Sequence, residues 1–177
     1  EPCISVLVLP NRQTALVAKQ AAELDILCGG RLRLGVGVGW NPVEFEAMGQ
    51  NIRNRGRRID EQISLLRSLW TTNSLDYTGT WNQVTHAGIN PLPPQLPIPI
   101  WMGGSSEPMM RRGAKLGNGW FPHSNPVPFN FEDGSGIAKV ERVHNYMREL
   151  GRDPKELDID GHLDAFNDRS PSQWANE

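Results

Sequence analysis

The sequence predicts an α/β protein with a parallel, barrel-like sheet, and three observations support this prediction. Short apolar runs alternate along the chain with segments of helical periodicity. The first run is nearly continuously apolar and β-branched, which is typical of a strand buried on both faces of a parallel sheet. Glycine-rich segments follow two of the runs, at the place where α/β proteins build ligand sites. We expect strands at 4–9, 32–38, 97–102, 119–122 and 157–163.

Helices are expected between these strands, because apolar residues there recur every three or four positions and glycines stop four of the five segments. A basic cluster at 53–58 is interpreted as a solvated face or loop rather than a phosphate site, since the chain carries no wider basic field. Residues 71–96 interrupt the alternation with a hairpin at 75–82, which is either a functional cover or a surface insertion. The helices are expected at 12–27, 42–48, 59–70, 107–116 and 136–150.

The segment Arg31–Trp40 is unusual because it carries glycine at positions 35, 37 and 39. Glycine at every second position leaves one face of a strand almost bare, which suits the close approach of another backbone or of a flat ligand. A helix start follows at once, with Asn41 as the expected cap and Glu44 at capping-box spacing. Ligand binding and close packing against a neighbouring strand both remain open on these residues alone.

A second glycine-rich turn, Gly103–Ser106, connects a predicted strand to a predicted helix. Two glycines allow close backbone approach, two serines offer hydroxyls, and the N–H groups of a helix start have no partner within the helix. Together these features suit an anion such as a phosphate. An ordinary serine-capped helix explains the same residues equally well.

Composition restricts the function further. A chain of 177 residues fits one domain, and a net charge of −2 gives no general attraction to nucleic acid or to membranes. The two cysteines, Cys3 and Cys28, are too few for a disulfide framework and indicate a reducing cytoplasm. No phosphate-loop, nucleophile-elbow or metal-helix motif is present, and His123, just past a predicted strand, fits a surface loop better than a catalytic role.

Four stretches make the chain resemble the bacterial luciferase-like monooxygenase superfamily, and within it the branch that includes oxidoreductases dependent on the deazaflavin coenzyme F-420. They are 6–10 with 18–25, then 29–41, 55–62, and 97–105 with 116–120. The resemblance spans nearly the whole chain. It implies a (β/α)8 TIM barrel, of which residues 1–177 form one incomplete domain covering about strands 3 to 7.

The resemblance also implies a cofactor site at the carboxyl ends of the strands, for reduced FMN or for coenzyme F-420. A bulge with a non-prolyl cis peptide, which supports the flavin ring in the family, falls on Ser5 and Val6. The cofactor phosphate is expected at the second glycine-rich turn, and the end of the next strand is expected to line the cofactor or substrate pocket. The implied cofactor-binding residues are Ser5, Val6, Gly37, Val38, Gly39, Trp40, Gly103, Gly104, Ser105 and Ser106.

Two departures from the family pattern narrow the activity. Trp40 stands where sugar-phosphate dehydrogenases of the deazaflavin branch have a glutamate acid, and Val38 stands where FMN luciferases have a phosphate-binding arginine. The implied function is a flavin- or deazaflavin-dependent oxidoreductase or monooxygenase, acting on a small organic substrate by hydride transfer or oxygen activation. The alternative is a non-catalytic flavin-binding relative with a shortened barrel. The missing strands imply completion by further chain or by a homodimer, and no catalytic or metal-binding residue is assigned.

Overall fold

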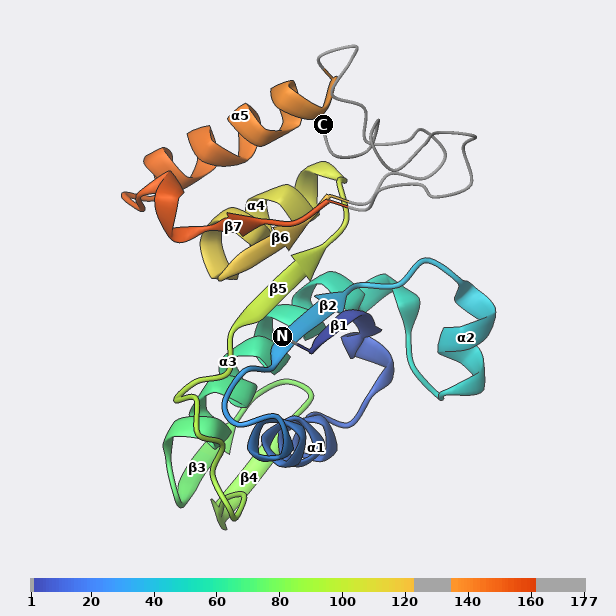
Figure 1. The fold of residues 1–177 in the computed structure, drawn as a ribbon. Coiled ribbons are helices and arrows are strands. Elements are labelled where there is room, and N and C mark those ends of the chain that lie inside the picture. Colours follow the sequence, from blue (N-terminus) through green and yellow to red (C-terminus); the bar gives the residue numbers. More distant parts are fainter. Residues whose placement is uncertain (1, 123–134, 162–177) are drawn as a thin grey trace, which may run out of the picture.

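Five parallel strands form the central sheet in the computed structural model, which describes residues 2–122 and 135–161. Their order in the sheet is β1-β2-β5-β6-β7, so the strands follow one another in space as they do along the chain (Figure 1). That order, with a helix in each main crossover, is the one expected for part of a β/α barrel. The bounds are β1 (Cys3–Val8), β2 (Arg33–Gly37), β5 (Ile100–Gly103), β6 (Gly119–Phe121) and β7 (Asp158–Ile159).

Helices pack on one face of this sheet. The crossover helices are α1 (Thr14–Leu27), α3 (Arg55–Thr71), α4 (Glu107–Leu116) and α5 (Ser135–Glu149), with a short α2 (Pro42–Ala47) after β2. Single turns of 3-10 helix, η1 (Leu9–Asn11), η2 (Ile52–Asn54) and η3 (Pro154–Glu156), join some of the elements. Because Asn41 accepts a hydrogen bond from Val43 N at 3.1 Å, α2 has the predicted cap, whereas Glu44 bonds to the Asn41 side chain and not to its backbone.

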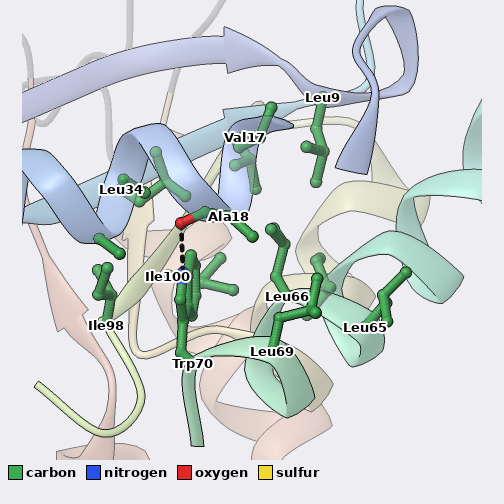
Figure 2. Packing of buried hydrophobic residues seen from close by; sticks show 14 of the residues in the cluster. Leu9, Val17, Ala18, Leu34, Leu65, Leu66, Leu69, Trp70, Ile98 and Ile100 are labelled. Atoms are coloured by element: carbon green, nitrogen blue, oxygen red, sulfur yellow. Dashed lines mark hydrogen bonds between the residues drawn. The ribbon is translucent and has the colours of Figure 1, made fainter. Parts of the chain in front are cut away.

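The main core lies between the sheet and helices α1 and α3. Every second residue of β2 and β5 points into it, and Trp70 of α3 fills its centre (Figure 2). The indole Nε1 of Trp70 donates a hydrogen bond to Ala18 O of α1 at 3.0 Å, so this fully buried side chain also joins the two helices. A second core, built around Trp120 and Met147, lies between β6 and helices α4 and α5.

The opposite face of the sheet is concave. A Cβ on Gly35 of β2 would lie 2.9 Å from the ring of Phe121 on β6, although β5 stands between these two strands. A Cβ on Gly103 of β5 would lie 2.6 Å from Cγ1 of Val6 on β1, again across an intervening strand. Side chains of next-nearest strands meet in this way only where a sheet curves toward them, as in the wall of a barrel.

Residues 71–96 leave the sheet as an antiparallel hairpin, β3 (Leu75–Thr78) and β4 (Gln83–Ala87), which lies beside α1 and α3 (Figure 1). The predicted hairpin at 75–82 is therefore too short, because Gly79–Asn82 form its turn and the returning strand comes later. The turn contacts the outer helices through Glu61 and Thr14. The hairpin covers the helix layer and does not lie over the carboxyl ends of the strands.

One further expectation was wrong. Strand β1 is not buried on both faces: Cys3, Ser5 and Val6 are exposed, because β1 is an edge of the described sheet and lacks a neighbour on one side. The basic cluster is a partly solvated face rather than a loop throughout, because Arg55–Arg58 make the first turn of α3 while Arg53 and Arg57 are exposed. His123 and the end of the predicted last strand at 162–163 lie outside the described residues.

No helix among the described residues combines the length and the apolar character needed to cross a membrane.

Replacing Trp70 by alanine tests the main core. The Trp70→Ala variant removes a fully buried indole and its hydrogen bond to α1, so we expect it to lower the free energy of unfolding by about 3–5 kcal/mol. Urea unfolding followed by circular dichroism measures this change. The control is Leu150→Ala, at a half-exposed position after α5, which should change stability by less than about 0.5 kcal/mol. Equal losses in both variants would contradict the packing described.

Candidate functional site

The candidate site is built around a bulge in β1. Between the pairs Ile4–Leu34 and Leu7–Val36, two residues of β1, Ser5 and Val6, stand opposite the single residue Gly35 of β2. The peptide bond between Ser5 and Val6 is cis, as the resemblance implied. Gly35 accommodates this arrangement directly, because the carbonyl oxygen of Ile4 occupies the place where a Cβ of residue 35 would be.

The bulge directs Val6 across the concave face of the sheet. Its Cγ2 lies 3.1 Å from the position of a Cβ on Gly37, and its Cγ1 lies 2.6 Å from that of a Cβ on Gly103. Three of the predicted site residues, from β1, β2 and β5, therefore meet in one layer near the carboxyl ends of their strands. Val6 has 39% of its surface exposed, so its apolar side chain forms part of the accessible surface of this layer.

The two glycines of β2 and Gly39 just after it do not leave an empty face. Chain atoms fill each position: the Ile4 carbonyl and Phe121 at Gly35, Val6 at Gly37, and Val8 with Phe45 at Gly39. At all three glycines the direct contacts are therefore made by other parts of the chain, as the close-packing alternative predicts. Their effect on a ligand is indirect, because they allow β1 and its bulge to approach.

Three further predicted site residues, Val38, Gly39 and Trp40, follow the end of β2. Gly39 has φ +73°, a left-handed conformation suited to glycine, and turns the chain toward α2. Val38 is half-buried against the main core, whereas Trp40 is 80% exposed. Among the described residues, nothing covers the Trp40 ring, so its predicted place in a pocket wall needs further protein or a ligand.

The turn from β5 to α4 is held rigidly at Gly104. Its N–H donates to Phe121 O at 3.0 Å, and its carbonyl accepts from Trp120 Nε1 at 2.8 Å. Within the described part of the chain, Ser105 Oγ is buried without a hydrogen-bond partner, and the Ser106 side chain makes no cap hydrogen bond to α4. The alternative of an ordinary serine-capped helix is therefore not what the turn shows. Pro108 has no N–H, and the Met109 N–H donates to Ser106 O at 2.8 Å, so the Ser105 hydroxyl and the Glu107 N–H are the groups left to bind an anion.

The acid nearest to this turn is directed away toward α5. Glu107 Oε1 accepts from Arg111 Nε at 3.1 Å and also from Tyr146 OH, while Arg142 Nη1 lies 3.7 Å from Oε2. The hydrogen bond from Tyr146 and the charges of both arginines hold the pKa of Glu107 below its usual value. Two cations therefore balance its negative charge, which reduces its repulsion of an anion bound at the turn.

A hollow of about 360 Å³ lies elsewhere on the described residues. It opens at the amino ends of the strands, lined by Leu32, Pro99, Trp101, Asn118 and Asp158 among others. Sequence reasoning missed the group above it, where Arg33 lies 4.8 Å from the centre of the Trp101 ring and 3.6 Å from the Asp160 carboxylate. Since barrel active sites lie at the carboxyl ends, the chemistry of the Gly103–Ser106 turn locates the candidate site better than this hollow does. No group of acidic, histidine or cysteine side chains in the described ranges is arranged to hold a metal ion.

Comparisons with known proteins agree with this geometry. The sequence model of the luciferase-like monooxygenase family matches residues 3–170. An uncharacterised protein of Mycobacterium tuberculosis is 43% identical over 162 residues, which are 91% of this chain and 53% of that protein. The FMNH(2)-dependent dimethylsulfone monooxygenase of Pseudomonas putida is 33% identical over 64% of this chain and 32% of its own.

Solved structures show the same fold. The coenzyme F-420 dependent tetrahydromethanopterin reductase of Methanopyrus kandleri superposes with a TM-score of 0.75 at 20% identity, covering 91% of this chain and 49% of that one. The described elements are thus part of a luciferase-like barrel, as predicted. The chain spans about half the length, or less, of the curated relatives that it matches.

The bulge should depend on the missing side chain of residue 35. In a Gly35→Ala variant the new methyl group would displace the Ile4 carbonyl, so we expect a loss of about 1–3 kcal/mol in the free energy of unfolding and altered amide shifts at Ser5 and Val6. Urea unfolding and NMR measure the two effects. Gly161→Ala is the matched control, since its Cβ would enter open space without a left-handed φ. Unchanged shifts at the bulge would contradict the role given to Gly35.

Proposed function

Because the chain belongs to the luciferase-like monooxygenase family, we propose that it forms the cofactor-binding part of a flavin- or deazaflavin-dependent oxidoreductase. The observation that carries the proposal is the Gly103–Ser106 turn. Its backbone is fixed at Gly104, the buried Ser105 hydroxyl lacks a partner within the described residues, and the ten-residue helix α4 begins there with the Glu107 N–H. Such a turn suits the phosphate of a cofactor.

The residues present fit the two ends of such a cofactor. FMN and coenzyme F-420 both join a flat tricyclic ring to a phosphate-bearing chain. The layer of Val6, Gly37 and Gly103 offers a flat apolar surface for the ring, and Ser105 with Ser106 and the Glu107 N–H would hold the phosphate. When bound in its reduced form, the cofactor supplies the hydride or the electrons for the reaction.

This chain's own residues contribute position and exclusion of water. Val6, fixed over two glycines, would support one side of the ring and keep water from it. The anchored turn would fix the position of the phosphate relative to the layer under the ring, because the Gly104 N–H and carbonyl are both bonded to β6. Val38, Gly39 and Trp40 would border the substrate side of the site, where the exposed Trp40 ring offers an aromatic wall.

The name of the Pseudomonas putida relative supports reduced FMN, and that of the Methanopyrus kandleri structure supports the deazaflavin. The sequence similarity of the first relative is greater, which favours FMN as the cofactor to test first. A small organic substrate and either hydride transfer or oxygen activation follow from the same proposal.

We further propose that additional barrel strands, from a longer polypeptide or a second copy, cover the open edge of β1. An apolar hollow of about 280 Å³ lies along this edge, lined by Pro2, Cys3, Ile4, Leu24, Leu27, Cys28 and Leu32. Leu27 is 82% exposed beside it. An unpaired strand edge with adjacent apolar side chains is unfavourable in water and is normally covered.

Removal of the Ser105 hydroxyl tests the phosphate site. We expect Ser105→Ala to weaken FMN binding roughly tenfold and to leave riboflavin, which lacks the phosphate, unaffected, because the lost hydrogen bond is to a charged group. Fluorescence titration of both flavins measures the difference. Ser68→Ala, on the exposed side of α3, is the matched control and should change neither affinity.

Further outcomes decide the rest of the proposal. Equal weakening of both flavins by Ser105→Ala would argue against a phosphate at this turn. Failure of the intact protein to bind FMN and coenzyme F-420 would contradict the function as a whole. If a cofactor binds, consumption of its reduced form in the presence of oxygen or of a candidate substrate separates an enzyme from a carrier.

Charge placed beside the β1 edge tests the proposed cover. In the intact protein, Leu27→Asp should lower the free energy of unfolding by about 2–4 kcal/mol, because a carboxylate would be buried at the new contact. Leu150→Asp adds the same charge at a half-exposed leucine distant from this edge in sequence and should have little effect. Urea unfolding of both variants provides the comparison, and equal stabilities would show that Leu27 stays in solvent.

A further inference from the structure

The turn of the β3–β4 hairpin is bound to a single carboxylate. Glu61 of α3 accepts hydrogen bonds from the backbone N–H groups of Thr80 at 2.7 Å, Trp81 at 3.0 Å and Asn82 at 2.9 Å, and from Asn82 Nδ2 at 2.8 Å. Gly79 completes the fit, since a Cβ there would collide with the same carboxylate. Four donors around one carboxylate make a charge-assisted contact of high specificity.

The contact continues from the hairpin to the sheet through three side chains. Asn82 Oδ1 accepts from Thr14 Oγ1 at 2.6 Å, and Thr14 Oγ1 accepts from Gln62 Nε2 at 3.1 Å. Gln62, next to Glu61 in α3, is fully buried and also donates to Leu9 O at 3.2 Å and to Arg12 O at 3.0 Å. The path therefore ends on the backbone of the loop 9–13.

That loop leaves the carboxyl end of β1, the strand that carries the bulge. Leu9, Pro10 and Asn11 form the buried turn η1 directly after Val8, and α3 packs against it. Val8 in turn contacts Gly39 at the end of β2. A movement of the loop would thus reach both β1 and β2 at the level of the candidate site.

We propose that Glu61 is a positioning residue. By binding the turn Gly79–Asn82 it fixes the loop 9–13, and through that loop it fixes the position of the Ser5–Val6 bulge in the cofactor site. The hairpin then supports the site from outside the helix layer. This role differs from both interpretations of residues 71–96 made from the sequence, a functional cover and a surface insertion. The link from the loop to the cofactor rests on the proposed function, whereas the link from Glu61 to the loop does not.

The hydrogen bonds hold Glu61 in its charged form. Burial raises the pKa of this carboxyl, but the donors from Asn82, Trp81 and Thr80 outweigh burial and bring the pKa below its usual value. The carboxylate is therefore ionised at neutral pH, where each of its four bonds has an anionic acceptor.

The first test is hydrogen exchange of the intact protein measured by NMR. In Glu61→Ala we expect the amides of Thr80, Trp81 and Asn82, and the Arg12 amide that donates to Leu9 O, to exchange roughly tenfold faster. Asn82→Ala should accelerate Arg12 while leaving Thr80 and Trp81 protected by Glu61. If the turn amides accelerate in Glu61→Ala but Arg12 does not, the positioning role is refuted.

The matched control lies on the same hairpin. Asp76 accepts from His86 N at 2.9 Å and pairs with His86 Nδ1 at 3.0 Å on the exposed side, so Asp76→Asn perturbs the hairpin without touching Glu61. It should leave Arg12 exchange unchanged, and acceleration there would contradict a specific path through Glu61. Glu61→Gln, which keeps the shape and one accepting oxygen, should give a smaller acceleration than Glu61→Ala and replaces it if alanine prevents folding.

The second test concerns the cofactor. If the wild-type protein binds FMN, Glu61→Ala and Asn82→Ala should change the visible circular dichroism of the bound flavin and raise its dissociation constant at least fivefold, whereas Asp76→Asn should do neither. An unchanged flavin spectrum together with accelerated Arg12 exchange would refute the extension of the role to the cofactor. If wild-type protein binds no cofactor, the proposed function fails, and the exchange comparison still decides the role of Glu61.

Discussion

The structure depends on the close approach of β1 to β2 at Gly35. The Ile4 carbonyl takes the space of an absent side chain, and this lets two residues of β1 stand opposite one residue of β2. The extra residue turns Val6 across the concave face, where it meets Gly37 and Gly103. The floor of the candidate site therefore depends on this one contact.

The two faces of the sheet are organised by different physical rules. Toward the helices, apolar side chains such as Leu34 and Ile100 pack around Trp70, and burial of apolar area is the main stabilising effect. Toward the concave face, steric fit dominates, because a large side chain on one strand occupies the space over a glycine on another. The first face makes the chain fold, and the second determines the surface available to a cofactor.

The predictability of each part follows from the range of the interactions involved. Helices and strands were predicted well because periodicity and glycine stops are local, and the Asn41 cap is set by its near neighbours. The burial of β1 was not, because it depends on a neighbouring strand and not on its own apolar sequence. The contacts of Gly35 and Glu61 join residues far apart in sequence, and no local pattern distinguishes them from an ordinary strand glycine or a solvated acid. The Gly103–Ser106 turn was recognisable because its chemistry is contiguous in the chain.

The pairing of large side chains with glycines on the concave face has a consequence for the evolution of this protein. The ring of Trp101 lies directly against Gly119, as that of Phe121 lies against Gly35. Neither member of such a pair can change size alone without leaving a void or a collision. Accepted substitutions on this face should therefore come as compensating pairs, and the interior of the barrel should diversify more slowly, and in larger steps, than its helical exterior.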